Sequence, residues 1–357
     1  MRLRHRKREL LLRSLTKKSK KMSEIGNVNC GYLTTVQIDQ EEIWNDPIQK
    51  IDLIADVNAA KAVLDNQSGQ VKFNELQGKK KKVLSVEWQT KCDVTTTACS
   101  DDCEITGEDI EPQCKEYEIE CLQESTFQVS DRIYRERTID QQKAIAKNIL
   151  YAKKALDEWL TQYLVTGIHV NAGVNVYTGG VGTVAGNTTT IQSSMWNDSI
   201  WGYFDLVNAL NKFRSPYLLT GTNLYQYVFN RMHESTTEAG RAAMSKVGTI
   251  RGIYQDVVNV EAVAPKHTFL IHKGAIAFIN KAWNQPVYKA ENKAGNYWLW
   301  SEESMNIPGI WYDIVMKETC TDNDFVQAYK VQLHGLFAVN PTPCDEDNTG
   351  ILQFVCA

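Results

Sequence analysis

The sequence lacks any long apolar run. No stretch of its 357 residues approaches the roughly 18 consecutive apolar residues that a membrane-spanning helix needs. Near the N-terminus the only apolar run is Leu10–Leu12, whereas the hydrophobic region of a secretory signal peptide has about 7–15 residues. We therefore expect a protein that has no membrane partner and that is made and folded in the cytoplasm.

The sequence also lacks the common catalytic motifs. Gly-x-Ser-x-Gly is absent, and Gly180, Gly182 and Gly186 have the spacing of neither a dinucleotide fingerprint nor a phosphate-binding loop. The six histidines form no ligand spacing, and His233-Glu234 is not followed by the second histidine of a zincin. We therefore expect no enzyme: no catalytic residue, no cofactor-binding residue, no metal ligand and no cofactor.

The cysteines are clustered but do not have the spacing of a zinc site. Five of the nine fall in one segment: Cys92, Cys99, Cys103, Cys114 and Cys121. A zinc site usually contains two close Cys-x2-Cys pairs, and only Cys99-x3-Cys103 approaches this pattern. The acidic side chains around them would raise the pKa of the thiols and oppose thiolate formation. Free thiols or late-formed disulfides are expected, and a cysteine-site metal-binding protein stays an alternative.

Charge is distributed unevenly along the chain. The formal net charge is −4, but residues 1–21 contain ten basic side chains and one acid, so the remainder carries −13. The segment from Asp101 to Glu120 contains nine acids and one base. The hydrophobic fraction of 43% is ample for a core and excludes a mainly disordered chain.

The first half of the chain contains three segments of different character after a polar stretch at 22–42. Apolar residues at near-helical spacing predict an amphipathic helix over 46–66. Residues 70–130 are rich in β-formers and predict two or three long strands around an acidic tip at 100–113, an extended hairpin with little core of its own. The pattern then predicts a long helix that begins at a capping box formed by Thr138 and Gln141 and ends at Gly167.

The second half alternates between helix and strand, which favours a compact mixed α/β domain over 198–285. The predicted helices are Ser199–Phe213 with Ile200, Trp201, Phe204, Val207 and Leu210 inward, Asn223–Met232, and Lys273–Ala282. The predicted strands are Tyr217–Leu219, Ile253–Val260, Thr268–Ile271, Trp311–Glu318 and Phe325–Val339. The last strand exceeds the usual length of about 3–10 residues, so we expect it to run between two sheets or domains.

This order of elements resembles the major capsid proteins of tailed double-stranded DNA bacteriophages, the Hong Kong 97-type fold that encapsulin shells share. Phe269-Leu-Ile-His-Lys-Gly-Ala-Ile-Ala-Phe is similar to the strand-then-helix of the family's axial domain. Phe325-Val-Gln-Ala-Tyr-Lys-Val-Gln-Leu-His-Gly-Leu-Phe-Ala-Val-Asn-Pro is similar to its long last strand. The resemblance implies an α+β fold with an N-terminal arm, an extended hairpin loop, a long spine helix and a mixed α/β axial domain.

The resemblance also implies a division of the chain into domains. The expected segments are an N-terminal arm and short helix at 1–69, the extended hairpin loop at 70–130, a peripheral domain with the spine helix at 131–172, the axial domain at 173–285, return strands of the peripheral and axial domains at 286–343, and a C-terminal tail at 344–357.

The function that the resemblance implies is self-assembly into the icosahedral capsid shell that encloses double-stranded DNA. The implied partners are the chain itself in hexamers and pentamers, other capsid or portal proteins, and packaged DNA through non-specific contacts, in a virion assembled in the host cytoplasm. No family-wide catalytic residue carries over. The side chains expected to face a basic patch on the next subunit are Asp101, Asp102, Glu104, Glu108 and Asp109. Those expected to meet DNA or acidic neighbours are Arg4, Arg6, Arg8, Lys17 and Lys20.

Three other functions remain open at the level of sequence. The first is an encapsulin-like shell that encloses protein cargo, which the basic arm disfavours because such a compartment needs no polyanion contact. The second is the cysteine-site metal-binding protein, or a zinc- or thiol-dependent enzyme that uses residues 92–121. The third is a monomeric nucleic-acid-binding protein whose binding weakens steeply with salt.

Overall fold

The computed structural model has an α+β fold and divides into two compact units, which are described separately. It describes residues 30–67, 83–89, 112–132, 140–175, 182–196, 199–213, 215–224, 250–283, 288–292, 295–321, 324–339 and 349–356. Among these residues no helix is both long enough and apolar enough to cross a membrane.

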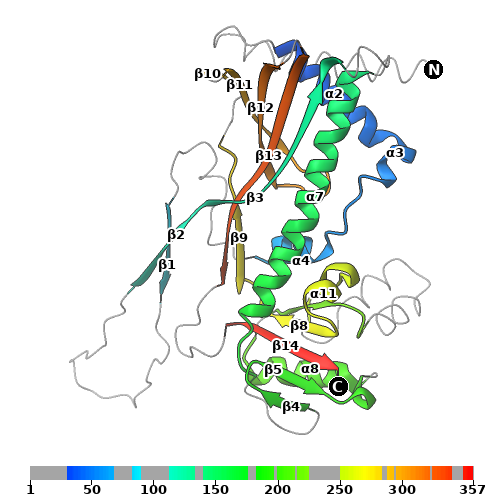
Figure 1. Cartoon of the computed structure of the whole chain (residues 1–357). Helices are drawn as coiled ribbons and strands as arrows, with labels where there is room; N and C mark the ends of the chain where they lie inside the picture. The colour runs from blue at the N-terminus through cyan, green and yellow to red at the C-terminus, as the bar shows by residue number, and fades with distance from the viewer. Residues whose placement is uncertain are drawn as a thin grey trace, which may run out of the picture. The chain divides into compact units, whose positions relative to one another are not determined.

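The first unit comprises residues 1–55, 123–156 and 282–333 and is built on an antiparallel sheet (Figure 1). The strand order is β10 (Tyr288–Asn292), β11 (Gly295–Glu303), β12 (Trp311–Thr321), β13 (Asp324–Val339) and β3 (Glu120–Ser130). Ile314 and Met316 on β12 are buried, as are Tyr329 and Val331 on β13, and alternate residues of both strands are more exposed. This two-residue period is expected of strands that bury one face, and it confirms the predicted strands at 311–318 and 325–339.

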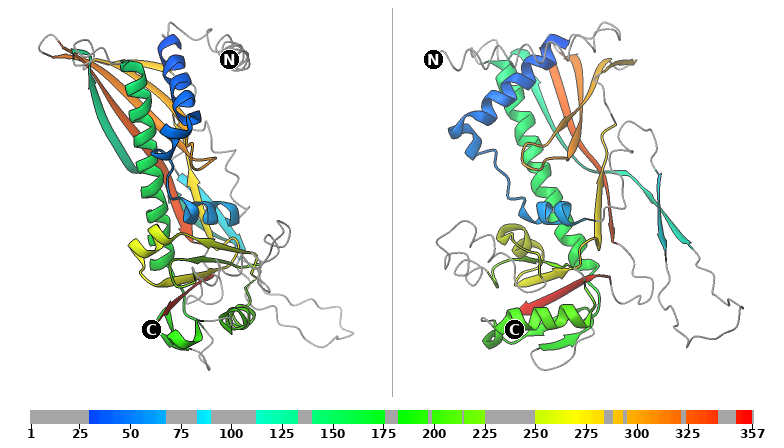
Figure 2. Two further views of the ribbon diagram at one scale, coloured as in Figure 1. Left: turned by 90° about the vertical axis from the view of Figure 1, so that its right-hand side faces the viewer. Right: turned by 180° about the vertical axis from the view of Figure 1, so that it is seen from behind.

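Among the described residues of the first unit, α2 (Cys30–Asn45), α3 (Pro47–Ile51) and the first part of α7 (Gln141–Val170) are helical. Helix α2 lies beside the N-terminal part of α7 (Figures 1 and 2). It buries Val36, Gln40 and Ile43, which share one helical face at spacings of four and three residues. This helix was not predicted, because the middle residue of its buried face is polar.

Helix α7 confirms the predicted long helix, but both of its predicted ends were wrong. The helix begins at Gln141, and the N-cap is Asp140, whose carboxylate oxygen accepts hydrogen bonds from the backbone N–H groups of Gln142 and Lys143 at 3.1 and 3.3 Å. At the other end the helix continues past Gly167 to Val170. Gly167 is therefore an interior residue of the helix and not its C-terminal stop.

The reason for glycine at position 167 is close packing within the second unit. A Cβ atom there would lie 2.6 Å from Cε1 of Phe337 on β13. We expect Gly167→Ala to lower the melting temperature by a few degrees, because overpacking costs about 1–3 kcal/mol and outweighs the roughly 1 kcal/mol that alanine gains in helix propensity. In a Phe337→Leu background the same change is expected to raise the melting temperature. Thermal unfolding of the four proteins tests this, and a single Gly167→Ala variant more stable than the wild type would contradict it.

The second unit comprises residues 56–122, 157–281 and 334–357 and contains a six-stranded mixed sheet. The strand order is β4 (Gly182–Ala185), β5 (Thr188–Ile191), β14 (Ile351–Cys356), β8 (His267–Ile271), β6 (Tyr217–Thr220) and β7 (Gly252–Gln255). The segment grouped above as a C-terminal tail thus includes β14, a central strand paired with both β5 and β8. The strands at 217–219 and 268–271 are confirmed.

Helix α8 (Ser199–Leu210) confirms the helix predicted at 199–213 and packs against this sheet. Ile200, Trp201, Phe204 and Val207 are buried in a cluster with Phe354 of β14, and the rings of Phe204 and Phe354 lie 5.1 Å apart. Leu210 was predicted to point inward but is 48% exposed at the last residue of the helix. The 3₁₀ turn η1 (Ser193–Met195) precedes α8.

Three other predicted elements were wrong in type or length. The helix predicted at 46–66 is two helices, α3 and α4 (Asn58–Asn66), separated by an irregular segment. The strand predicted at 253–260 ends with β7 at Gln255, and α11 (Val257–Val263) follows. The helix predicted at 273–282 is instead β9 (Ile276–Asn280), which pairs with β13 so that Phe278 lies opposite Phe337. The helix predicted at 223–232 falls mostly outside the described residues.

Candidate assembly surfaces

The predicted hairpin is present as a separate two-stranded antiparallel sheet (Figure 1). Strands β1 (Val83–Gln89) and β2 (Pro112–Glu118) pair from Val83 opposite Glu118 to Gln89 opposite Pro112. Neither strand joins either of the two larger sheets. An isolated two-stranded hairpin is at best marginally stable in water, so this pair needs a surface to pack on.

The residues predicted to act between subunits lie outside the described residues. This holds for Asp101, Asp102, Glu104, Glu108 and Asp109 at the predicted tip, and for Arg4, Arg6, Arg8, Lys17 and Lys20 in the basic arm. Cys92, Cys99 and Cys103 also lie outside, whereas Cys121, Cys320 and Cys356 are described, and Cys320 is an exposed free thiol. Within the described ranges no group of three or more His, Cys, Asp or Glu residues could hold a metal ion.

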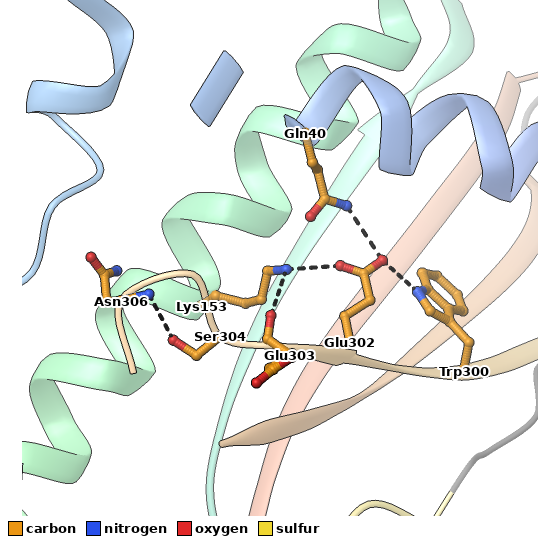
Figure 3. A network of polar contacts seen from close by, with 7 residues as sticks. All are labelled: Gln40, Lys153, Trp300, Glu302, Glu303, Ser304 and Asn306. Atoms are coloured by element: carbon orange, nitrogen blue, oxygen red, sulfur yellow. Dashed lines mark hydrogen bonds and ion pairs between the residues drawn. The ribbon is translucent and has the colours of Figure 1, made fainter. Parts of the chain in front are cut away.

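In the first unit a buried carboxylate joins three segments that are far apart in the sequence (Figure 3). Glu302 on β11 accepts hydrogen bonds from Nζ of Lys153 on α7 at 2.8 Å, from Nε1 of Trp300 at 2.8 Å and from Nε2 of Gln40 on α2 at 3.3 Å. Lys153 and Glu302 form an ion pair whose side chains are only 3% and 9% exposed. The network therefore attaches α2 and α7 to the sheet.

The protonation state of Glu302 follows from these contacts. Burial by itself would raise the pKa of the carboxyl group, but the Lys153 ammonium and the donated hydrogen bonds outweigh it. The pKa of Glu302 is therefore lowered below its ordinary value, and the residue is ionised at neutral pH. Removal of either partner of such a buried ion pair leaves an uncompensated charge, which is strongly destabilising.

The chain after Glu302 forms a turn that contains Ser304 and Asn306 (Figure 3). Oγ of Ser304 accepts hydrogen bonds from the backbone N–H groups of Asn306 and Ile307 at 3.1 and 3.0 Å. The Asn306 side chain in turn accepts from the N–H of Ala55 at 3.1 Å and donates to the carbonyl of Leu53 at 3.2 Å. Because Asn306 satisfies these two backbone groups, the chain can leave the helical conformation after α3.

In the second unit one carboxylate caps two helices. The Asp256 side chain accepts hydrogen bonds from the backbone N–H of Ala59 in α4 at 2.9 Å and from that of Asn259 in α11 at 3.0 Å. Burial raises the pKa of Asp256 above its ordinary value, and the donated hydrogen bonds offset only part of the effect. Asp256 thus explains why a helix begins at 257 and why another begins at 58.

Sequence reasoning missed both of these polar sites. Each site depends on partners that are distant in the sequence: Lys153 and Gln40 lie 149 and 262 residues from Glu302, and Ala59 lies 197 residues from Asp256. For Asp256 a weak signal existed, because an aspartate that follows a short apolar strand often caps the next helix. For Glu302 no signal was present in the sequence.

The comparisons with known proteins concern the fold. No protein-family model and no curated protein sequence matches the chain. A chain from the capsid asymmetric unit of cyanophage A-1(L) matches with a TM-score of 0.54 at 10% identity, over 85% of this chain and 93% of its own. Chains from the capsids of Ralstonia phage GP4 and cyanophage P-SCSP1u give TM-scores of 0.43 and 0.42 at 12% and 14% identity, over 79% and 78% of this chain and 85% and 84% of their own.

Only the first of these three matches has a TM-score above 0.5, and the assignment of the fold rests on it. The chain has the fold of a phage capsid protein, and the predicted Hong Kong 97-type fold is confirmed. The long helix α7, the β1–β2 hairpin and the long strand β13 are the described elements that correspond to the predicted spine helix, extended loop and last strand.

Proposed function

We propose that the protein is a structural subunit that self-assembles into the icosahedral capsid shell of a tailed bacteriophage and has no enzymatic role. The observation that carries the proposal is the match of nearly the whole chain to a phage capsid chain, over 85% of one and 93% of the other. The β1–β2 hairpin adds support, because a strand pair that belongs to neither large sheet has a clear use if it packs on a neighbouring subunit.

The partners follow from this proposal. Hexamers and pentamers of the chain form the shell, other capsid and portal proteins complete it, and the enclosed double-stranded DNA is met through non-specific contacts. The basic residues Arg4, Arg6, Arg8, Lys17 and Lys20 suit phosphate contacts, whose strength falls with salt. The chain is located in the virion and is assembled in the host cytoplasm. The six segments expected from the sequence, from 1–69 to 344–357, act as its domains.

Negative-stain electron microscopy of the purified full-length chain tests the proposal. We expect regular shells, rings or tubes once the concentration or salt is varied. A persistent monomer over the whole range of both would contradict it. Shells that retain protein cargo and exclude nucleic acid would instead support the encapsulin-like alternative.

Metal analysis with thiol counting tests the cysteine-site alternative. We expect no bound metal and nine reactive thiols after unfolding under reducing conditions. A stoichiometric metal that is released when the thiols are modified would contradict the structural function and favour the metal-binding one.

A further inference from the structure

Helix α3 and the turn that follows it present apolar side chains to solvent. Ile48, Ile51 and Ile54 are 80%, 71% and 52% exposed, although isoleucine is one of the residues most often buried. They follow one another at a spacing of three residues, and the N–H of Ile54 donates to the carbonyl of Lys50 at 3.1 Å, so the helical turn continues to the third of them. Leu53 is buried, so the segment is packed on its inner side. The three isoleucines form an α3 stripe, and exposed apolar groups of this kind mark interaction sites.

The surroundings of the α3 stripe are acidic. Residues 39–55 contain five acids and one base, Lys50, whose ammonium lies 4.8 Å from the ring centroid of Trp44. Lys154 of α7 adds a second base, which donates to the carbonyl of Asp52 at 2.9 Å, and the acids still outnumber the bases. Glu42 and Asp52 are exposed. A partner that fits this surface therefore combines apolar side chains with positive charge.

The chain contains such a partner shortly before α2. Residues 10–21, Leu-Leu-Leu-Arg-Ser-Leu-Thr-Lys-Lys-Ser-Lys-Lys, include four leucines, five bases and no acid. This leucine–lysine segment matches the α3 stripe in both respects, with leucines for the isoleucines and bases for the carboxylates. DNA phosphates would satisfy the bases alone and would leave the leucines in water.

The length of the chain permits this contact within one molecule. From Lys21 to Cys30, where α2 begins, an extended chain reaches about 30 Å. Helix α2 has 16 residues and is about 24 Å long, and α3 follows it directly after the N-cap Asp46 (Figure 2). The segment can therefore run back along α2 to the α3 stripe. A short connection gives an effective concentration of about millimolar, so the segment of the same chain is favoured over that of a second copy.

We propose that the α3 stripe is the docking surface for the leucine–lysine segment of the same chain. Docking covers the exposed isoleucines and places the bases of the segment beside Glu42 and Asp52. While the segment is docked, Lys17 and Lys20 meet carboxylates, so the phosphate contacts proposed above require its release. The contact lies within one molecule and needs no shell, so it does not rest on the capsid function.

Limited digestion with trypsin tests the contact. Trypsin cleaves after the bases of the segment, and cleavage follows the population in which these bases are accessible. We expect Ile48→Gln/Ile51→Gln to raise the rate of cleavage within residues 13–21 by about tenfold. Leu11→Gln/Leu15→Gln is expected to raise the rate to the same extent, because it removes the other half of the apolar contact and leaves α3 unchanged.

Two further variants complete the design. Phe325→Gln makes the same kind of change at a 59%-exposed residue of the first unit, and this matched control is expected to be cleaved like the wild type. Glu42→Gln/Asp52→Asn is expected to raise the rate by a smaller factor, since exposed charge pairs contribute little. All four variants keep every lysine and arginine, so a change in rate reports access to the bases. Circular dichroism and thermal unfolding verify that each variant is folded.

Several results would overturn the proposal. One is a wild type that is cleaved as fast as Leu11→Gln/Leu15→Gln, and another is an Ile48→Gln/Ile51→Gln variant that is cleaved as slowly as the wild type. Protection that disappears on dilution would place the segment on a second copy. Protection that appears only when DNA is added would make phosphate its partner. A wild type that forms no shells but protects the segment would refute the proposed function and leave this contact standing.

Discussion

Lys153→Met is expected to lower the free energy of unfolding by about 3–5 kcal/mol, because it leaves the Glu302 carboxylate buried without its counter-charge. Methionine has a similar volume, so the loss reports on charge and not on packing. The carboxylate would retain only the hydrogen bonds from Trp300 and Gln40, at 2.8 and 3.3 Å. Urea or guanidinium unfolding followed by circular dichroism measures the effect.

The matched control for this prediction replaces the pair as a whole. Lys153→Met/Glu302→Leu removes both charges, and replacing a buried ion pair by apolar groups of similar volume is often neutral or stabilising. We expect the double variant to be far more stable than Lys153→Met alone. A single Lys153→Met variant within about 1 kcal/mol of the wild type would show that the buried pair does not hold α2, α7 and β11 together.

The pH dependence gives a second check with a definite sign. In the wild type the pKa of Glu302 is lowered, so its stabilisation is present above the unfolded pKa of about 4.3 and is lost as the pH falls through the lower, folded-state pKa. In Lys153→Met burial is no longer offset by the ammonium, so the pKa is expected to rise. The stability difference between the two proteins should therefore be largest at neutral pH and shrink in acid, and a difference that grows in acid would contradict the argument.

Asp256→Ala is expected to cost about 1–4 kcal/mol, because it removes a hydrogen-bond acceptor from the N-termini of both α4 and α11 and each such cap contributes roughly 0.5–2 kcal/mol. The backbone N–H groups of Ala59 and Asn259 would lose their acceptor in a buried site. Because α4 and α11 both begin at this carboxylate, we expect loss of protection in both helices together when amide hydrogen exchange is followed.

Asp46→Ala is the control for a single cap. Asp46 caps only α3, where it accepts a hydrogen bond from the Ile48 N–H at 3.0 Å, and this site is exposed. We expect its removal to cost about 1 kcal/mol or less. If Asp256→Ala cost no more than Asp46→Ala, the double capping by Asp256 would be refuted as a source of stability.

The elements that could be predicted from sequence are those with long, regular patterns. Helix α7 repeats its apolar positions over many turns, and β13 alternates over much of its length, so no alternative conformation buries the same residues. The hairpin at 83–118 was predictable because its β-formers flank an acidic stretch that cannot form a core. Short apolar segments gave errors, since the run at 273–282 fits a helix or a buried strand equally well and only pairing with β13 makes β9 a strand.

The sequence by itself determined the charge distribution, the long elements and hence the capsid-type fold, because these depend on periodicity and composition within continuous segments. Tertiary structure alone decided which polar groups are buried together. Glu302 is ionised because Lys153 and Gln40 contact it from helices that are distant in the chain. The Asp256 carboxylate, which directly follows β7, accepts hydrogen bonds from the N-termini of both α4 and α11. Hydrogen bonds and ion pairs act over about 3 Å of space and not along the sequence, so only the folded chain brings such partners together.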